Sequence, residues 1–75
     1  MKKKYKVKTC SKGYVSYREE EVIGTLSELA KKFRSYLGGV VPRKPETLQK
    51  RLNDYSKRNE TIYTYTVFYV DEVND

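Results

Sequence analysis

Residues 25–58 read TLSELAKKFRSYLGGVVPRKPETLQKRLNDYSKR, and this stretch decides the fold because it predicts two amphipathic helices separated by a loop. Thr25 and Glu28 form a capping-box pattern, in which each side chain satisfies the other residue's backbone amide at the start of a helix. Apolar residues then recur at helical spacing, and they are Leu26, Leu29, Ala30, Phe33 and Leu37. Gly38 can adopt the left-handed conformation that ends helices. The first helix is therefore expected at about residues 25–37.

Two prolines mark the loop that follows, and the second of them suits the start of another helix. The residue before a proline is pushed towards extended geometry, while Pro45 itself fits the first helical position. The second helix is expected at about residues 45–58, with Asn59 as a left-handed stop. Its inward stripe consists of Leu48, Leu52 and Tyr55.

The N-terminal part of the chain predicts a β-hairpin at about residues 4–23. Polar and apolar residues alternate with the period of a strand, so that one face holds Tyr5, Val7 and Thr9 and the other holds Lys4, Lys6 and Lys8. Residues 11–13 fit a three-residue hairpin loop with Gly13 in the left-handed position. That loop pairs Thr9 with Val15 and Val7 with Tyr17, and it places Lys4 across from Glu20 and Lys6 across from Arg18.

A C-terminal strand is expected at about residues 60–71, because the segment is β-branched or aromatic almost throughout. Its two faces hold Tyr63, Tyr65, Val67 and Tyr69, and Ile62, Thr64, Thr66, Phe68 and Val70. Both faces are fairly apolar, which predicts an interior strand or a strand whose second face meets a partner, including a second copy in a homodimer. The fold class is therefore α+β, a single domain (residues 1–75) ordered β-β-α-α-β. Its three-stranded, mostly antiparallel sheet carries two helices on one face, with strand order left open.

The residues that usually carry catalysis are scarce. The chain has no histidine and one cysteine, Cys10, so it lacks the usual base near neutral pH, a plausible zinc ligand set and any internal disulfide. We expect no catalytic residues, metal, cofactor or small-molecule substrate. A lone thiol fits a reducing, cytoplasmic compartment. No apolar run is long enough for a signal peptide or a membrane span, so no membrane partner is expected.

Positive charge is concentrated in the helical region. The net charge is +6, and residues 31–58 contain nine basic side chains against two acidic ones. A clustered basic face is typical of proteins that bind nucleic acid or an acidic partner, although a merely solvated lysine face is the alternative. The candidate partner or nucleic-acid binding residues are Lys31, Lys32, Arg34, Arg43, Lys44, Gln49, Lys50, Arg51, Lys57 and Arg58. A secondary basic strand face consists of Lys4, Lys6 and Lys8.

The segments TLSELAKKF (25–33) and PETLQKRL (45–52) resemble a helix-turn-helix DNA-binding element. In such elements a supporting helix with a buried alanine precedes a recognition helix that opens near a Pro-x-Thr. The resemblance implies that Thr47, Gln49, Lys50 and Arg51 face a DNA groove, and that Arg43, Lys44, Lys57 and Arg58 contact phosphates. The chain departs from the pattern in having seven residues, 38–44, where the motif has a tight turn.

Residues 5–70 also resemble short accessory proteins of tailed phages. The shared features are a Lys-Gly-Tyr hairpin (12–14), an Ile-Gly-Thr-Leu-x-Glu-Leu helix start (23–29), a Pro-x-Thr-x-x-x-x-Leu helix start (45–52) and a Tyr-x-Tyr strand. The resemblance implies a phage or prophage setting, in which small basic proteins often bind and redirect host machinery, including defence systems. Our first functional hypothesis is therefore a non-enzymatic protein in an infected or lysogenic bacterium that binds a host protein or nucleoprotein complex, as a host-takeover or anti-defence factor. We rank this function first, because exposed tyrosines suit a protein interface. Direct DNA binding through the helix pair ranks second.

Overall fold

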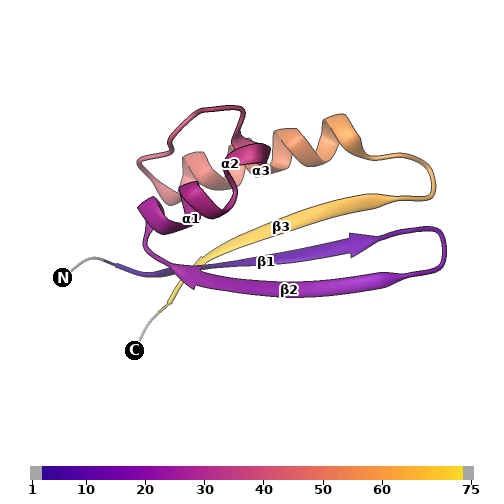
Figure 1. The fold of residues 1–75 in the computed structure, drawn as a ribbon, viewed down its shortest axis with the longest axis horizontal. Helices are drawn as coiled ribbons and strands as arrows, with labels where there is room; N and C mark the ends of the chain where they lie inside the picture. The colour runs from indigo at the N-terminus through magenta and orange to yellow at the C-terminus, as the bar shows by residue number, and fades with distance from the viewer. Residues whose placement is uncertain (1–2, 74–75) are drawn as a thin grey trace.

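The structure is a computed structural model that describes residues 3–73. One antiparallel sheet forms one layer and the helices cover one of its faces (Figure 1). The elements are β1 (Tyr5–Lys12), β2 (Tyr17–Gly24), α1 (Leu26–Lys32), α2 (Arg34–Leu37), α3 (Pro45–Asn59) and β3 (Tyr65–Glu72). The strand order is β2-β1-β3, so the α+β fold with a three-stranded antiparallel sheet is confirmed.

The capping box at the start of the helical region is present as predicted. The Thr25 backbone amide donates to Glu28 Oε1 at 2.8 Å, and the Glu28 amide donates to Thr25 Oγ1 at 3.3 Å. The single helix expected over residues 25–37 is instead divided at Phe33 into α1 and the four-residue α2. Phe33 and Tyr36 both contact the Phe68 ring of β3, with centroids 6.2 and 5.4 Å away. Residues three apart lie on the same side of a helix, so the division keeps this face on the sheet.

Helix α3 starts at Pro45 as predicted, but its end differs from the prediction. Asn59 is the last helical residue, and Glu60 follows it in extended conformation. The prediction that Asn59 adopts the left-handed conformation was wrong. The Asn59 side chain instead donates from Nδ2 to the Tyr55 carbonyl at 2.8 Å, and it thereby supplies a hydrogen-bond partner to a carbonyl at the end of the helix.

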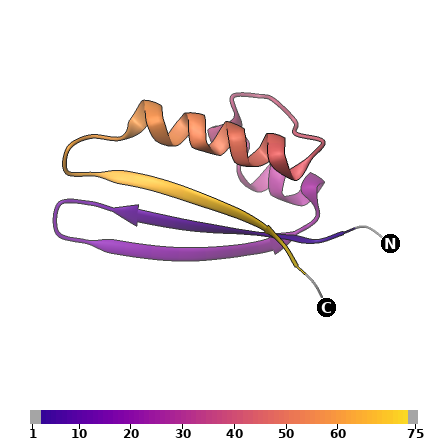
Figure 2. The same ribbon diagram turned by 180° about the vertical axis from the view of Figure 1, so that it is seen from behind.

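The hydrophobic core lies between the sheet and the helices. Helix α3 runs along β3 (Figure 2), and Leu48 and Leu52 of α3 are fully buried. They are joined there by Val7, Leu29 and Phe68. The fully buried side chains come from strand and helix alike, so neither layer retains this core without the other.

The hairpin register differs from the predicted one. The loop between β1 and β2 has four residues, 13–16, closed by a hydrogen bond from the Gly13 amide to the Ser16 carbonyl at 2.9 Å. Gly13 does not have the positive φ that the predicted loop required. Thr9 therefore pairs with Glu20, and Val7 pairs with Val22. This register places a valine of β2 over the core, where the predicted register would have placed Tyr17.

The C-terminal strand is shorter than predicted and lies at an edge of the sheet. Thr61 and Thr64 form a turn, with the Thr61 amide donating to the Thr64 carbonyl at 2.8 Å and the Thr64 amide donating to Thr61 Oγ1 at 2.9 Å. Threonine hydroxyls compete with strand pairing in this way, so β3 begins only at Tyr65. The prediction of an interior strand was wrong, because β1 occupies that position.

Candidate binding surfaces

The two layers differ in charge, and the helix layer carries the excess. Residues 25–59, the helices and their connecting loop, contain nine basic and three acidic side chains. The described sheet layer, residues 3–24 and 60–73, contains six basic and six acidic side chains. Three ion pairs within residues 3–73 join groups of the sheet layer, namely Lys3–Glu72, Lys8–Glu19 and Arg18–Glu20. None of these three pairs involves a basic side chain of the helix layer, whose basic groups exceed its acidic groups by six.

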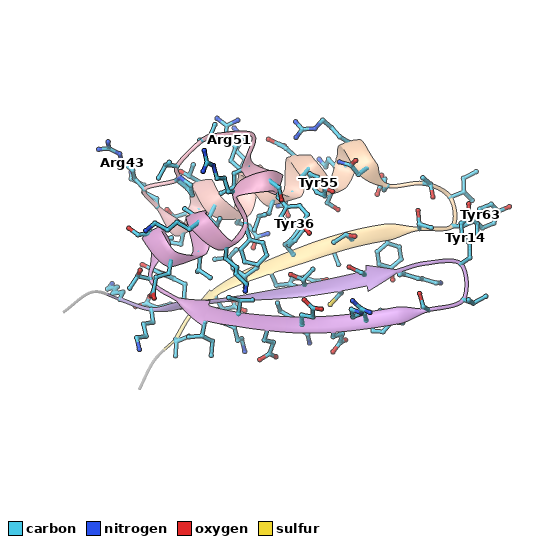
Figure 3. The ribbon with its side chains drawn as sticks, viewed as in Figure 1. Tyr14, Tyr36, Arg43, Arg51, Tyr55 and Tyr63 are labelled. Carbon is cyan, nitrogen blue, oxygen red and sulfur yellow. The ribbon has the colours of Figure 1, made fainter. Side chains whose placement is uncertain are left out.

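Most of the predicted binding residues lie exposed on this helix layer. Arg43 and Arg51 project from the side of the helices that faces away from the sheet (Figure 3). The exposed basic residues of the helix layer are Lys31, Lys32, Arg34, Arg43, Lys44, Lys50, Arg51, Lys57 and Arg58. We call this set the cationic helix surface. Three separate segments contribute to it, so the fold gathers charges that are up to 27 positions apart in the sequence.

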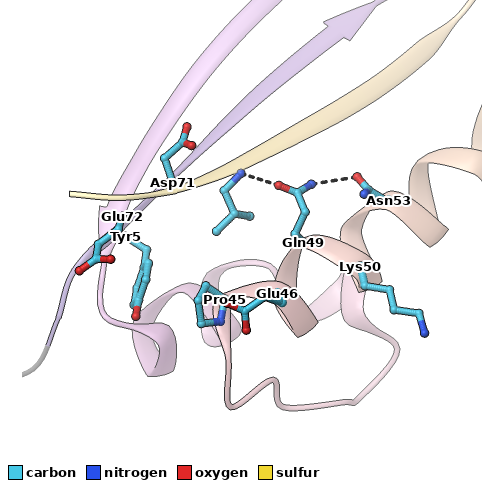
Figure 4. A pocket seen from close by; sticks show the side chains of 9 residues that line it. Tyr5, Pro45, Glu46, Gln49, Lys50, Asn53, Asp71 and Glu72 are labelled. Atoms are coloured by element: carbon cyan, nitrogen blue, oxygen red, sulfur yellow. Dashed lines mark hydrogen bonds between the residues drawn. The ribbon is translucent and has the colours of Figure 1, made fainter. Parts of the chain in front are cut away.

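Gln49 is the exception among the predicted residues, because its side chain is bound to the edge of β3 (Figure 4). Gln49 Oε1 accepts from the Val70 amide at 2.7 Å, and Gln49 Nε2 donates to the Phe68 carbonyl at 2.8 Å. The same nitrogen donates to Asn53 Oδ1 at 2.9 Å. The side-chain amide thus occupies the place of a peptide group in a fourth strand. It is not free to read a base, and the row of groove-facing residues implied by the helix-turn-helix resemblance is interrupted here.

A second side chain of α3 continues this cover over the β3 edge. Ser56 is buried, and its hydroxyl donates to the Thr66 carbonyl. Open edge strands invite pairing with other chains, and natural proteins cover them to prevent it. Strand addition at the β3 edge, one route to the homodimer considered from the sequence, is therefore obstructed by α3.

A shallow depression of about 590 Å³ lies where α3 meets the end of β3 (Figure 4). Glu46, Asp71 and Glu72 line it together with Lys50. Carboxylates therefore outnumber cations in this depression. It forms the boundary of the cationic helix surface at the start of α3.

The lysines of β1 are not part of the cationic helix surface. Val7 of the same strand points into the core, so alternation places Lys6 and Lys8 on the opposite, open face of the sheet. Lys8 Nζ lies 3.8 Å from Glu19 Oε2, and Asp71 stands across from Lys6. The predicted secondary basic strand face is thus separated from the helices by the sheet and accompanied by acids. Lys4 precedes β1 and is exposed.

The open face of the sheet also carries tyrosines, and one of them is chemically unusual. Tyr17 Oη donates to Glu19 Oε1 at 2.8 Å. This hydrogen bond, with a smaller contribution from Cys10, raises the pKa of Tyr17 well above its ordinary value. Tyr65 and Tyr69 of β3 are exposed on the same face. The second apolar face of β3 is therefore uncovered.

An apolar tip lies at the end of the sheet, and it was not predicted from the sequence. Tyr14 of the hairpin loop lies beside Tyr63 of the loop before β3 (Figure 3). Their sequence neighbours Val15 and Ile62 are exposed as well. The Tyr14 and Tyr63 ring centroids are 5.7 Å apart, and Ile62 is 92% exposed. Two loops nearly 50 residues apart build this tip, so only the tertiary structure could reveal it.

Within residues 3–73, no three cysteine or carboxylate side chains are grouped as a metal site would require. No helix in the same range is long and apolar enough to cross a membrane. Comparisons of the chain with protein-family models, curated proteins and solved structures give no match.

Proposed function

We propose that this protein is a non-enzymatic binding module whose cationic helix surface contacts the nucleic acid of a nucleoprotein complex. The observation that carries the proposal is the separation of charge between the layers. The helix layer contains nine basic and three acidic side chains, while the described sheet layer contains equal numbers of basic and acidic side chains. A uniformly solvated lysine coat would distribute its charge over both layers, whereas a one-sided excess suits a polyanionic partner.

The exposed face of α3 is the best-placed part of this surface. Lys50, Arg51, Lys57 and Arg58 are all exposed, and the opposite face of α3 is fixed on β3. These side chains therefore project from a rigid support. Because Gln49 is engaged with β3, the proposed contact is with phosphates rather than with base edges, and it predicts binding with little sequence preference.

The resemblance to tailed-phage accessory proteins extends the proposal to its biological setting. In an infected bacterium the partner would be a nucleoprotein complex of the host, and binding would inhibit or redirect it as an anti-defence or takeover factor. Contact with free DNA through the same surface is the simplest form of the activity, and it gives the first experiment.

A salt titration of binding to a fluorescently labelled 20-base-pair duplex tests the proposal. About five phosphate contacts should give a slope of about −4.5 in a plot of log K against log salt concentration. Reversal of two charges in the variant Lys50→Glu/Arg51→Glu should weaken binding and make the slope shallower by about two. The matched control is Lys4→Glu/Lys12→Glu, which changes the net charge equally in the sheet layer. Absence of binding at 50 mM salt, or equal losses in both variants, would refute a specific role for the helices.

A further inference from the structure

An apolar groove lies inside the helix layer, between the α1–α2 segment and the loop that follows α2. Ala30, Val40 and Val41 provide its apolar lining, while Lys31 and Arg34 provide its charged lining. Its volume is about 350 Å³, which is within the range of small binding sites. None of the described residues that line it is acidic. The groove therefore combines two features that call for different groups on a ligand.

Two glycines create this groove by turning the chain after α2. Gly38 and Gly39 have φ values of +62° and +86°, and a Cβ at either position would meet nothing within 4 Å. Backbone conformation, rather than crowding, therefore requires glycine here. The Val40 amide then donates to the Leu37 carbonyl at 3.2 Å, and the buried Pro42 holds the far end of the loop. The loop is thereby fixed beside α1 instead of extending into solvent.

The chemistry of the groove selects one kind of occupant. A phosphate would pair with Lys31 and Arg34 but would leave the apolar lining in water, where Val41 is already 70% exposed. A neutral apolar group would cover that lining but would leave both cations without a counter-charge. An aliphatic side chain flanked by carboxylates satisfies both, since burial of apolar area and pairing of opposite charges then occur together.

We infer that the groove holds an acidic segment of a partner protein, with an aliphatic side chain on Ala30 and Val41 and carboxylates against Lys31 and Arg34. The inference rests on the proposed function, because it identifies the protein component of the nucleoprotein complex by its chemistry. Nucleic acid on α3 and an acidic segment on α1–α2 would occupy different parts of the cationic helix surface. The two contacts can therefore be tested separately.

A peptide titration followed by amide NMR tests the groove directly. The probe is acetyl-Asp-Glu-Leu-Leu-Asp-Glu-amide, and the control peptide replaces both leucines by glycine at unchanged charge. We expect saturable shifts centred on the amides of Lys31, Gly39 and Val41, and affinity at least about tenfold lower for the control peptide, since burial of one leucine accounts for that difference. Equal affinities, no binding, or shifts centred on the apolar tip would overturn the inference.

Two charge-neutralising variants complete the experiment. Lys31→Gln/Arg34→Gln should weaken binding of the leucine peptide at least tenfold, while Lys57→Gln/Arg58→Gln, with the same net charge, should stay within about threefold of the parent protein. Equal weakening in both would show attraction by net charge alone and would overturn the inference. Peptide binding without DNA binding would refute the proposed nucleic-acid contact and leave the groove standing. DNA binding without peptide binding would overturn the inference about the groove and leave the proposed nucleic-acid contact standing.

Discussion

The side chain of Gln49 stabilises the β3 edge, and its replacement by methionine should show how strongly. Methionine has nearly the same length and helix propensity, so the substitution removes the hydrogen bonds and little else. The Val70 amide and the Phe68 carbonyl, now bonded at 2.7 and 2.8 Å, would lose their partners. Leaving one buried polar group unpaired costs about 1–3 kcal/mol. Two groups lose their partners here, and because both are only part-buried we take the lower part of the range for each and expect a total loss of about 2–3 kcal/mol in unfolding free energy.

The assay for Gln49→Met is urea denaturation monitored by circular dichroism. With a slope of about 1 kcal/mol per molar urea, the midpoint should fall by about 2–3 M. Native-state hydrogen exchange should also show the Val70 amide exchanging faster than its neighbours in β3. The control is Asn53→Ala, which removes only the exposed bond from Gln49 Nε2 to Asn53 Oδ1 and should change stability by less than about 0.5 kcal/mol. A loss below 1 kcal/mol in Gln49→Met, or an equal loss in the control, would refute the edge-capping role.

Two further predictions concern local interactions. Thr25→Ala should lower the unfolding free energy, measured by urea denaturation, by about 1 kcal/mol through loss of the helix cap. Thr25→Ser keeps the hydroxyl and should leave the unfolding free energy nearly unchanged. Equal losses of unfolding free energy in the two variants would contradict the role of the Thr25 hydroxyl as a cap. Tyr17 should remain protonated at a pH where ordinary tyrosines, with a pKa of about 10, ionise, as measured by NMR of the labelled ring. Because its folded pKa is raised, its hydrogen bond contributes stability below about pH 10, and this contribution is lost as the pH rises through the folded pKa. In Glu19→Gln the Tyr17 titration should move to lower pH, and an unmoved titration would exclude Glu19 as the cause.

Local sequence patterns determined the elements of this protein. The capping box at Thr25, the left-handed Gly38 and the helical start at Pro45 each follow from the preferences of one residue and its near neighbours. The α+β class follows as well, because two helical periods between β-prone segments require a sheet covered on one side. The concentration of positive charge in residues 31–58 is equally a property of the sequence.

Tertiary structure decided the register, the strand order and the roles of side chains that face a neighbouring element. The hairpin register depends on Val22 lying over the core beside Val7, a contact that no turn pattern specifies. Gln49 looks in the sequence like one more polar residue of a basic helix, and it becomes a structural group only because β3 presents unpaired backbone atoms beside it. The lysines of β1 and those of the helices are separated because a strand sends alternate side chains to opposite faces of the sheet. Periodicity identifies each element's faces, but only packing determines what each face meets.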